Sequence, residues 1–422
     1  MSGVGLVVNV PVWGDRYVER WLRWSLPSLL APGNLVGVAE RVGVLVQVVT
    51  DVGGADRLRD EGLVRELGEL VRVEFVELDG LRGGILGMTQ ANLVSLRFAS
   101  EAQLPFCFTW ADMVWSDGGF GSVVERLLGC RAVLSWSCVL SESGVASGLD
   151  ASRIGSWLRV SGRQLAGWVL EHPHATLRGS EVGADFVPSG PTNVVWVSPD
   201  RSCALVRAHT WQLFGVNFSR IASGDAAHYL RLLAAGRAND SVDTYGPIVG
   251  DLSEVSFISD SDEMLAVSVD DESRPVTSRS VSCEPDQTSA MLRDSVRLFQ
   301  SREWVVPLSR YLFTRGYHLH TSEEVMWSQE MERDTRDLAA TVAIHDHRSS
   351  LRNVLMRRVT LLLVRLPRWM RTSIRFTLDV LTGWARWFGD LVVRAFPNLL
   401  GPMTRIRGLA NWFVRWVREV TQ

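Results

Sequence analysis

The chain has 422 residues, enough for two or three domains, and its 46% hydrophobic content excludes a chain too polar to form a packed core. No run of about 18 apolar residues occurs, so the sequence predicts no helix that spans a bilayer. The net charge is −3, but residues 351–422 carry 13 Arg against three acidic residues, and the remainder has an acidic excess. The two parts therefore have different electrostatic roles.

The basic residues bear on the kind of ligand, and the cysteines bear on the cellular compartment. All 44 basic residues are Arg, whose guanidinium binds phosphate in a bidentate manner. The five cysteines are scattered and form no C-x-x-C pair, which is typical of thiols in a reducing compartment. Residues 1–11 lack a positively charged n-region. We therefore expect no signal peptide and a cytoplasmic protein.

Residues 5–140 alternate between apolar runs and helical patterns. The runs predict five strands at 5–13, 42–50, 71–78, 105–115 and 131–140, with helices at 15–30, 55–70, 86–102 and 121–128. Near-continuous apolar strands that alternate with helices indicate an α/β fold with a mostly parallel sheet, flanked by helices on both faces.

The pattern changes after residue 150. We predict a helix to about residue 171, strands at 194–197, 203–208, 255–258 and 264–269, and a helix at 226–235. A polar, Ser-rich segment at 270–286 indicates a linker, followed by helices at 289–316 and a charged connector at 322–348. The predicted domains are therefore a catalytic domain at 1–270, a linker and helical extension at 271–350, and a tail at 351–422.

Ligands of parallel α/β sheets bind beyond the carboxyl ends of the strands. In this chain those positions hold residues 13–15, 50–51, 79 and 112–117. In the last segment Asp112 ends a buried strand, and Asp117 follows shortly before two glycines. Two carboxylates at a strand end suit a divalent cation that neutralises a leaving diphosphate. The alternative is a capped turn with Asp117 as the N-cap of the next helix.

Several motifs resemble a bacterial GT-A-type glycosyltransferase-like family. They are W-G-x-x-Y at 13–17, L-P-S-L-L-A-P-G-N-L at 26–35, and D-x-x-x-S-D-G at 112–118. The segments R-Q-L-A-G-W-V-L-E-H-P at 163–173, S-V-D-T-Y at 241–245 and S-D-S-D-E-M at 259–264 follow in the family's order. The resemblance covers roughly residues 5–320 and excludes the tail.

The resemblance implies a GT-A-like, Rossmann-type fold and a nucleotide-sugar donor. It implies that the donor nucleotide lies near residues after the first two strands, namely Pro11, Val12, Trp13, Gly14, Thr50 and Asp51. It also implies that Gln90 and Asn92 touch the donor and that Asp112 lies on the diphosphate side.

Each candidate acid–base or metal-binding residue has a functional interpretation and a structural one. Asp112 and His209 are the candidate ligands of Mn²⁺ or Mg²⁺. Where many GT-A enzymes have Asp-x-Asp, this chain has Trp110-Ala111-Asp112, which leaves a metal-independent or inactive variant open. Asp112, Asp117, Asp243 and Asp262 are the candidate catalytic carboxylates, among which Asp243 and Asp262 are candidate general bases. Capping of helices and turns is the alternative for each.

His172 and His174 are further candidates for acceptor or metal contacts, although most histidines in mixed surroundings are structural. The H-D-H sequence at 345–347 is typical of a solvated face.

The tail predicts amphipathic helices separated by prolines. In the last one Leu409, Trp412, Phe413, Trp416, Val417 and Val420 share a face at helical spacing. A helical subdomain packed on the core explains this pattern as well as an anionic membrane surface does. Five Trp among 13 Arg suit the headgroup layer, so we expect a peripheral protein at the inner face of the plasma membrane.

The sequence thus predicts a glycosyltransferase that moves a sugar from a nucleotide diphosphate sugar to a glycan or lipid-linked acceptor. A catalytically inactive, membrane-associated scaffold or partner-binding protein is the alternative. No nucleic-acid partner is expected, because the core is acidic and carries no such binding motif.

Overall fold

The computed structural model describes residues 3–81, 84–181, 186–188, 193–208, 211–236, 242–271, 278–280, 311–312 and 315–322. The chain divides into two compact units, residues 1–343 and 344–422. All described residues belong to the first unit. The predicted tail at 351–422 and most of the predicted extension at 271–350 lie outside the described residues.

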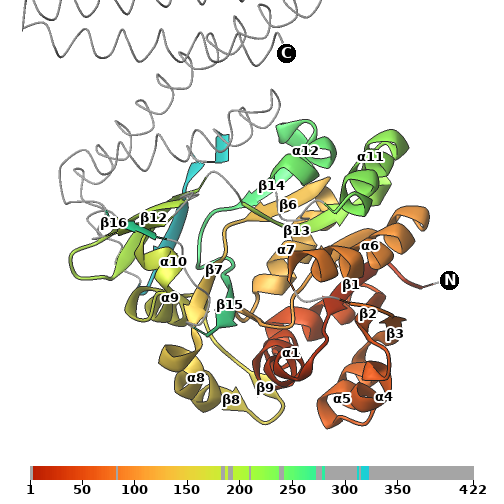
Figure 1. The fold of residues 1–422 in the computed structure, drawn as a ribbon, viewed down its shortest axis with the longest axis horizontal. Helices are drawn as coiled ribbons and strands as arrows, with labels where there is room; N and C mark the ends of the chain where they lie inside the picture. The colour runs from red at the N-terminus through yellow and green to blue at the C-terminus, as the bar shows by residue number, and fades with distance from the viewer. Residues whose placement is uncertain are drawn as a thin grey trace, which may run out of the picture. The chain divides into compact units, whose positions relative to one another are not determined.

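A seven-stranded sheet forms the centre of the first unit (Figure 1). Its order is β14-β6-β13-β4-β1-β2-β3, and only β13 runs antiparallel to its neighbours. The strands are β1 (Leu6–Pro11), β2 (Val44–Asp51), β3 (Arg72–Leu78), β4 (Pro105–Phe108), β6 (Ala132–Ser135), β13 (Gln212–Asn217) and β14 (Val255–Ile258). The expectation of a mixed α/β fold with a mostly parallel sheet is confirmed.

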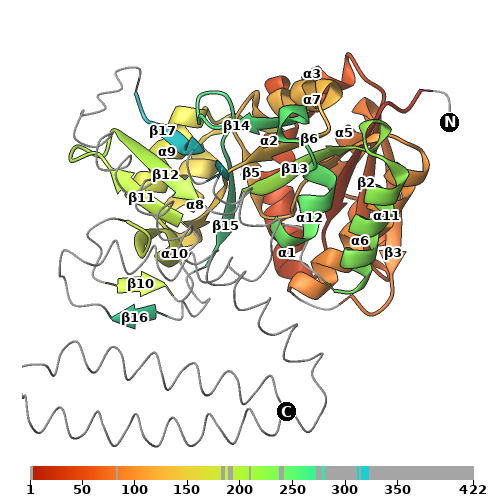
Figure 2. The same ribbon diagram turned by 90° about the horizontal axis from the view of Figure 1, so that it is seen from above.

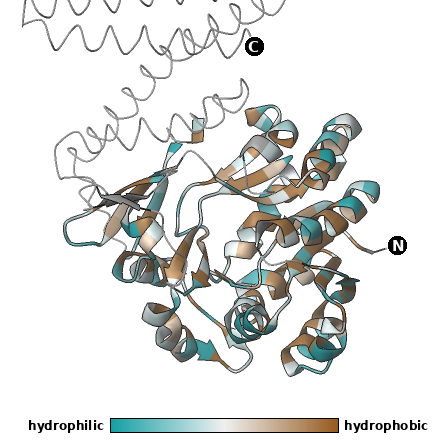
Figure 3. Ribbon diagram, viewed as in Figure 1, coloured by the Kyte–Doolittle hydropathy of each residue, from teal (hydrophilic) through white to brown (hydrophobic). Residues whose placement is uncertain are grey.

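The apolar runs explain the middle of this sheet. Every residue of β1 is buried, as are all residues of β2 except Asp51. Buried strands of this kind need cover on both faces, and helices supply it. Helices α6 (Ile85–Glu101), α11 (Ser223–Ala234) and α12 (Val242–Val249) lie on one face, while α3 (Gly37–Ala39) and α7 (Gly119–Gly129) lie on the other (Figure 2). Figure 3 shows hydrophobic and hydrophilic residues side by side on the outer helices.

Two predicted strands each divide into two strands that belong to different sheets. The prediction at 105–115 becomes β4 and β5 (Met113–Trp115), and the prediction at 131–140 becomes β6 and β7 (Cys138–Ser141). Strands β5 and β7 flank β15 (Ala266–Asp270) in a separate sheet of order β5-β15-β7. The single-strand predictions were wrong because an apolar run does not reveal a bend, here the turn closed by Met113 N–H to Trp110 O at 3.1 Å.

The helices between the first strands differ in detail from the predictions. The predicted helix at 15–30 forms α1 (Asp15–Arg20), a π-helical turn η1 (Trp21–Ser25) and α2 (Leu26–Leu29), followed by η2 (Pro32–Val36). The predicted helix at 55–70 is two helices, α4 (Gly54–Arg59) and α5 (Gly62–Leu70), because the backbone of Glu61 is extended. The predicted helix before residue 171 is α8 (Glu142–Ala151), a β8–β9 hairpin (Arg153–Ile154, Trp157–Leu158) and α9 (Gly162–Glu171).

Smaller elements complete the unit. Strands β11 (Asn193–Val197), β12 (Cys203–Ala208) and β17 (Tyr317–His320) form an antiparallel sheet, and β10 (Phe186–Pro188) pairs with β16 (Ser278–Ser280). Short helices are α10 (Ala175–Arg178), η3 (Phe218–Arg220) and η4 (Leu252–Glu254). Strands β16 and β17 come from the predicted extension at 271–350 and pair with strands of the first unit. Among the described residues, no helix combines the length and apolar character needed to cross a membrane.

Candidate active site

The order of the strands reverses beside β1. The chain passes from β1 to β2 and β3 on one side, and then continues from β4 on the other side of β1. In open α/β sheets, ligands bind at such a switch point, in the crevice outside the carboxyl ends of the strands. The segment after β1 (Val12 to Gly14) and the segment after β4 (Thr109 to Asp112) lie at this point. The segment after β4 is tied to β1, since Thr109 N–H donates to Asn9 O at 3.1 Å.

The four residues predicted after β1 divide into two buried and two accessible ones. Pro11 and Val12 are buried, and Val12 N–H extends the ladder to β2 by donating to Val49 O at 2.9 Å. Trp13 is half-buried and Gly14 is exposed. Gly14 has a φ of 74°, which favours glycine, and it opens α1. Trp13 and Gly14 are therefore the residues of this group that a ligand can reach.

Asp51 is the last residue of β2, and Arg57 links it to Asp15 of α1. Arg57 on α4 donates to Asp51 Oδ1 at 3.3 Å and to Asp15 Oδ1 at 3.0 Å. Thr50 is buried and donates to Asp51 Oδ1 at 3.2 Å. The side chains of Arg57 and Asp51 are 51% and 38% exposed, so this bridge lies open at the carboxyl edge. No pattern in the sequence singles out Arg57, which is one of many arginines on amphipathic helices.

Asp112 lies where the chain leaves the central sheet for β5. Its side chain is half-buried, and Ser268 Oγ donates to its Oδ1 at 3.5 Å. Its backbone carbonyl accepts from Val269 N–H at 2.9 Å. Strand β15 therefore fixes the position of Asp112 at the switch point.

An ionic cluster joins the end of β15 to α1. Arg20 and Asp270 are 3% and 4% exposed and 3.0 Å apart, and Arg20 also pairs with Glu142. Burial acts to lower the pKa of Arg20, but its hydrogen bonds with Glu142 and Asp270 outweigh this effect and raise the pKa above its usual value. Arg16 pairs with Asp270 at 2.7 Å and Asp271 at 2.6 Å and stays 46% exposed. Arg16 and Arg57 are thus accessible guanidinium groups near the ends of β1 and β2, which sequence reasoning missed.

Gln90 and Asn92 lie on different sides of α6. Asn92 is fully buried and accepts from Asn9 Nδ2 at 2.6 Å, while its own amide nitrogen is buried with no hydrogen-bond partner among the described residues. Gln90 is exposed and lines a cavity of about 270 Å³ together with residues of α6, α11 and the end of β3. The structure therefore does not bring the two amides together, and donor contact by either stays a prediction.

Asp117 and Asp262 lie together, apart from Asp112. Asp112 and Asp117 lie at opposite ends of β5, as hydrogen bonds with the antiparallel β15 and the residue before it show. Asp112 O accepts from Val269 N–H, whereas Ser116 N–H donates to Leu265 O. Asp117 and Asp262 both line one cavity of about 620 Å³. Each carboxylate holds an arginine, Arg159 for Asp117 and Arg163 for Asp262.

The structure describes only the backbone of the predicted carboxylate Asp243, and it does not describe the predicted metal ligand His209. Asp243 belongs to the first turn of α12, and its side chain lies outside the described residues, as does His209 altogether. The hydroxyl of Tyr245 on that turn donates to Trp211 O at 2.6 Å. Since Trp211 directly precedes the antiparallel β13, the first turn of α12 lies at the carboxyl edge of the sheet.

The described residues contain no group of three or more His, Cys, Asp or Glu side chains that could hold a metal ion. A Mg²⁺ ion bound through one or two carboxylates, water and substrate phosphates needs no such group. Asp112 at the switch point fits that looser mode of binding.

Four described histidines, His172, His174, His318 and His320, have structural roles or contacts with other side chains. His174 is buried and its Nδ1 accepts from Thr176 N–H at 3.3 Å, which caps α10. His172 ends α9 and packs against Gly144. Sequence reasoning did not single out His318 and His320, whose rings stack with centroids 6.1 Å apart. His320 Nε2 lies 3.2 Å from Asp260.

Comparisons with known proteins add similarities of fold only. No family model matches the chain, and no curated protein matches it. Among solved structures, it is similar to S. aureus TarS 1-349 in complex with UDP-GlcNAc, at 11% identity and a TM-score of 0.31, covering 74% of this chain and 71% of that one. A mannosyltransferase from Pyrobaculum calidifontis, PcManGT, in complex with GDP-Man and Mn²⁺ is similar at 12% identity and a TM-score of 0.28, covering 82% and 86%.

The UTP-bound UGPase from Acinetobacter baumannii is similar at 10% identity and a TM-score of 0.26, covering 73% of this chain and 98% of that one. At these identities and scores, the similarity assigns neither an activity nor a ligand to this chain.

Proposed function

We propose that the first unit is a GT-A-like glycosyltransferase domain that uses a nucleotide diphosphate sugar. The observation that carries this proposal is the position of Asp51 and Asp112. Asp51 ends β2 and Asp112 follows β4, the two strands that flank β1, so both lie at the edge where open α/β sheets bind ligands. The resemblance of the motifs at 13–17, 26–35 and 112–118 gives independent support.

The proposed roles follow from these positions. The nucleotide lies against Trp13, Gly14 and Asp51, and the diphosphate lies beside Asp112. In the transfer, an acceptor hydroxyl loses its proton to a carboxylate, its oxygen bonds to the anomeric carbon, and the bond to the nucleoside diphosphate breaks. Asp243 is the candidate general base, since the first turn of α12 lies at the carboxyl edge. Asp262 is less suited, because both its oxygens accept from Arg163 at 3.0 Å.

The leaving diphosphate needs positive charge. Asp112 would hold a Mn²⁺ or Mg²⁺ ion, which would act as a Lewis acid when bound. Arg16 and Arg57 are accessible guanidinium groups after β1 and β2, and they supply charge in a metal-independent reaction. We propose a glycan or lipid-linked acceptor at the cytoplasmic face of the plasma membrane.

An inactive, GT-like binding protein is the alternative, and the Trp110-Ala111-Asp112 segment favours it. Trp110 and Ala111 are 8% and 3% exposed, so Asp112 is the only carboxylate of this segment and no second one can be recruited from it. Such a protein would bind a partner without turning over a donor.

A panel of sugar nucleotides tested by thermal shift, with and without Mn²⁺ or Mg²⁺, separates the two functions. Binding at 100 times the Kd stabilises the folded state by about 2.7 kcal/mol, which is a measurable rise in Tm. A rise with at least one sugar nucleotide is the result that the glycosyltransferase predicts. No rise with any sugar nucleotide or nucleoside diphosphate would favour the inactive binding protein.

The tail remains a proposal from sequence. Its 13 Arg and five Trp support binding to an anionic membrane surface, where each basic residue contributes about 1 kcal/mol. The intact chain should float with anionic liposomes and not with neutral ones. Flotation that persists after deletion of residues 351–422 would place the membrane contact elsewhere.

A further inference from the structure

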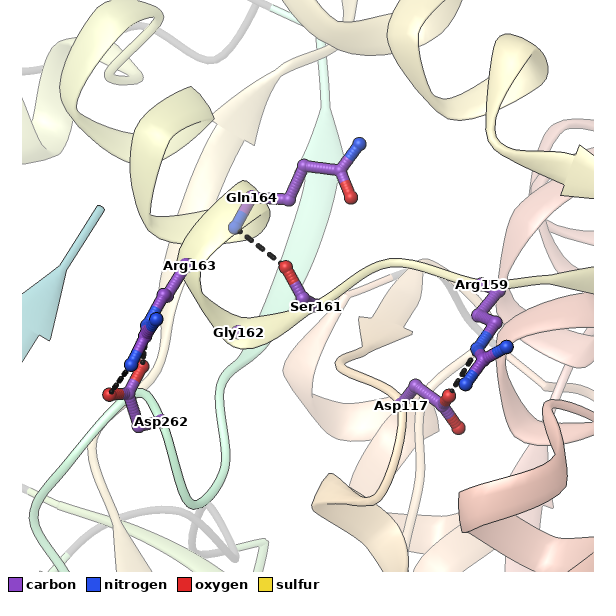
Figure 4. A pocket seen from close by; sticks show the side chains of 7 residues that line it. All are labelled: Asp117, Arg159, Ser161, Gly162, Arg163, Gln164 and Asp262. Carbon is purple, nitrogen blue, oxygen red and sulfur yellow. Dashed lines mark hydrogen bonds and ion pairs between the residues drawn. The ribbon is translucent and has the colours of Figure 1, made fainter. Parts of the chain in front are cut away.

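A polar cavity of about 620 Å³ lies at the far end of β5 from Asp112. It is lined by Asp117, Arg159, Ser161, Gly162, Arg163, Gln164 and Asp262 (Figure 4). Five residues of extended chain span roughly 17 Å at most, which bounds the Cα separation of Asp112 and Asp117. Asp112 does not line this cavity. The bound on the separation puts the cavity and the switch point within reach of one extended ligand.

Two arginine–aspartate pairs stand on either side of Ser161 and Gly162, where α9 begins (Figure 4). Arg163 donates from Nε and Nη2 to the two oxygens of Asp262, both at 3.0 Å. Arg159 donates from Nε to Asp117 Oδ2 at 2.8 Å, and its side chain is 62% exposed. The bond at Nε orients the guanidinium while its terminal nitrogens have no protein partner among the described residues. Arg159 is thus a positioned donor at the cavity.

Asp117 is itself held in place. Its Oδ1 accepts from Gly33 N–H at 2.9 Å, so the carboxylate that orients Arg159 is anchored to the 26–35 segment. Gly162 brings the start of α9 against Ser261, since a Cβ at this position would lie 1.9 Å from Ser261 O. Part of the cavity wall is therefore held in place by this close backbone contact and by the anchored carboxylate of Asp117.

The charges of the cavity decide the class of ligand. The formal charges of the two arginines and two aspartates that line it cancel, so these side chains provide no excess positive charge for an anion. Hydroxyl groups both donate and accept, and they can therefore bond to carboxylate and guanidinium alike. Ser161 and Gln164 add a hydroxyl and an exposed amide to the lining. A neutral polyhydroxylated ligand fits this wall better than a phosphate or an acidic glycan, and the volume lies within the range of ligand pockets.

We propose that this cavity binds neutral sugar residues of the acceptor glycan, away from the hydroxyl that reacts. The inference rests on the proposed glycosyltransferase function and names its acceptor class. Binding of remote, non-reacting sugars holds the acceptor in register, and this binding energy can be used for orientation at the reacting centre.

The test measures binding of defined oligosaccharides to the intact chain by isothermal titration calorimetry. The neutral probes are maltohexaose, cellohexaose, chitohexaose and α-mannohexaose, and the anionic probes are inorganic phosphate and a hyaluronan hexasaccharide. Arg159→Gln and Gln164→Ala remove cavity groups on exposed side chains. Arg153→Gln in the β8–β9 hairpin is the matched control, since Arg153 is exposed and does not line the cavity.

At least one neutral hexasaccharide should bind, and each cavity variant should raise its Kd about tenfold, the effect of one lost hydrogen bond to a charged or polar group. Arg153→Gln should bind as the unmodified chain does. The proposal is overturned if no neutral probe binds, if the cavity variants bind as the control does, or if only the anionic probes bind.

Thermal shift with sugar nucleotides on the same variants separates this proposal from the proposed function. The cavity variants should keep the donor-induced rise in Tm, because the cavity lies away from the switch point. If no sugar nucleotide binds but a neutral hexasaccharide binds and is weakened by the cavity variants, the donor role fails and the glycan site stands.

Discussion

The carboxylate of Asp117 accepts a hydrogen bond from the backbone N–H of Gly33 at 2.9 Å. This bond joins two of the motifs on which the family resemblance rests, residues 26–35 and 112–118. Asn34 reinforces the joint, because its Nδ2 donates to Ser116 O at 3.1 Å and its Oδ1 accepts from Phe120 N–H at 2.9 Å. The two motifs therefore form one interlocked unit, and part of their sequence requirement is structural.

Asp117→Ala should destabilise the protein by about 1.5–3 kcal/mol, because it removes an acceptor from a backbone donor and a partner from Arg159. Chemical denaturation measures the free energy of unfolding. Asp117→Asn keeps an oxygen for Gly33 and should lose less. Equal stability of Asp117→Ala and the unmodified chain would show that the bond to Gly33 contributes nothing.

Gly33→Ala should destabilise the protein by about 1–3 kcal/mol through overpacking. A Cβ at Gly33 would lie 2.7 Å from both Asp117 Oδ1 and Gly118 N, and the second of these is backbone. Gly68→Ala is the matched control, since a Cβ at Gly68 in α5 meets nothing within 4 Å and helix propensity should add about 0.5–1 kcal/mol. The two alanine variants should thus shift Tm in opposite directions, and a shift in the same direction would argue against the interlock.

Asp51→Ala should weaken sugar-nucleotide binding about tenfold, because the donor would lose its hydrogen bond to the carboxylate at the end of β2. Titration calorimetry with the donor found by thermal shift gives the Kd. Asp56→Ala provides the comparison, since Asp56 on α4 is 84% exposed and pairs with Arg59. A Kd that is unchanged in Asp51→Ala would place the nucleotide elsewhere.

Stability should fall as the pH drops through the usual pKa of histidine. Burial, with His320 adding to it, lowers the pKa of His318 below its ordinary value of 6.5. The unfolded chain therefore binds more protons than the folded one below this pH, so unfolding is favoured by acid. His318→Gln should reduce the slope of unfolding free energy against pH between about pH 8 and pH 5.5. An unchanged slope in this variant would assign the acid sensitivity to other groups.

The sequence predicted the parallel half of the fold well. Continuous apolar runs gave β1 and β2, and the rule on strand ends placed Asp51 and Asp112 at the carboxyl edge. It did not predict β13, which contains Gly215 at a register shift, where a Cβ would lie 2.8 Å from Leu127. The packing of α7 against the sheet requires that glycine, and the local sequence pattern does not show this packing.

The site was less predictable because its contacts join distant residues. Asp112 and Asp117 are close in sequence, yet the turn after β4 and the strand β5 separate them. Asp117 and Asp262 are far apart in sequence and share a cavity. Arg16 and Arg57 acquire their positions from Asp270 and Asp51, and no spacing in the sequence indicates those pairs.

The release of nucleoside diphosphate from a sugar nucleotide, compared between the unmodified chain and Asp112→Asn, tests the proposed active site most directly. Loss of the carboxylate that would hold a divalent cation against the leaving diphosphate should lower the rate about 100-fold or more. Asp60→Asn, which alters an exposed carboxylate at the end of α4, should leave the rate unchanged. Turnover by Asp112→Asn at the unmodified rate would contradict the placement of the diphosphate beside Asp112.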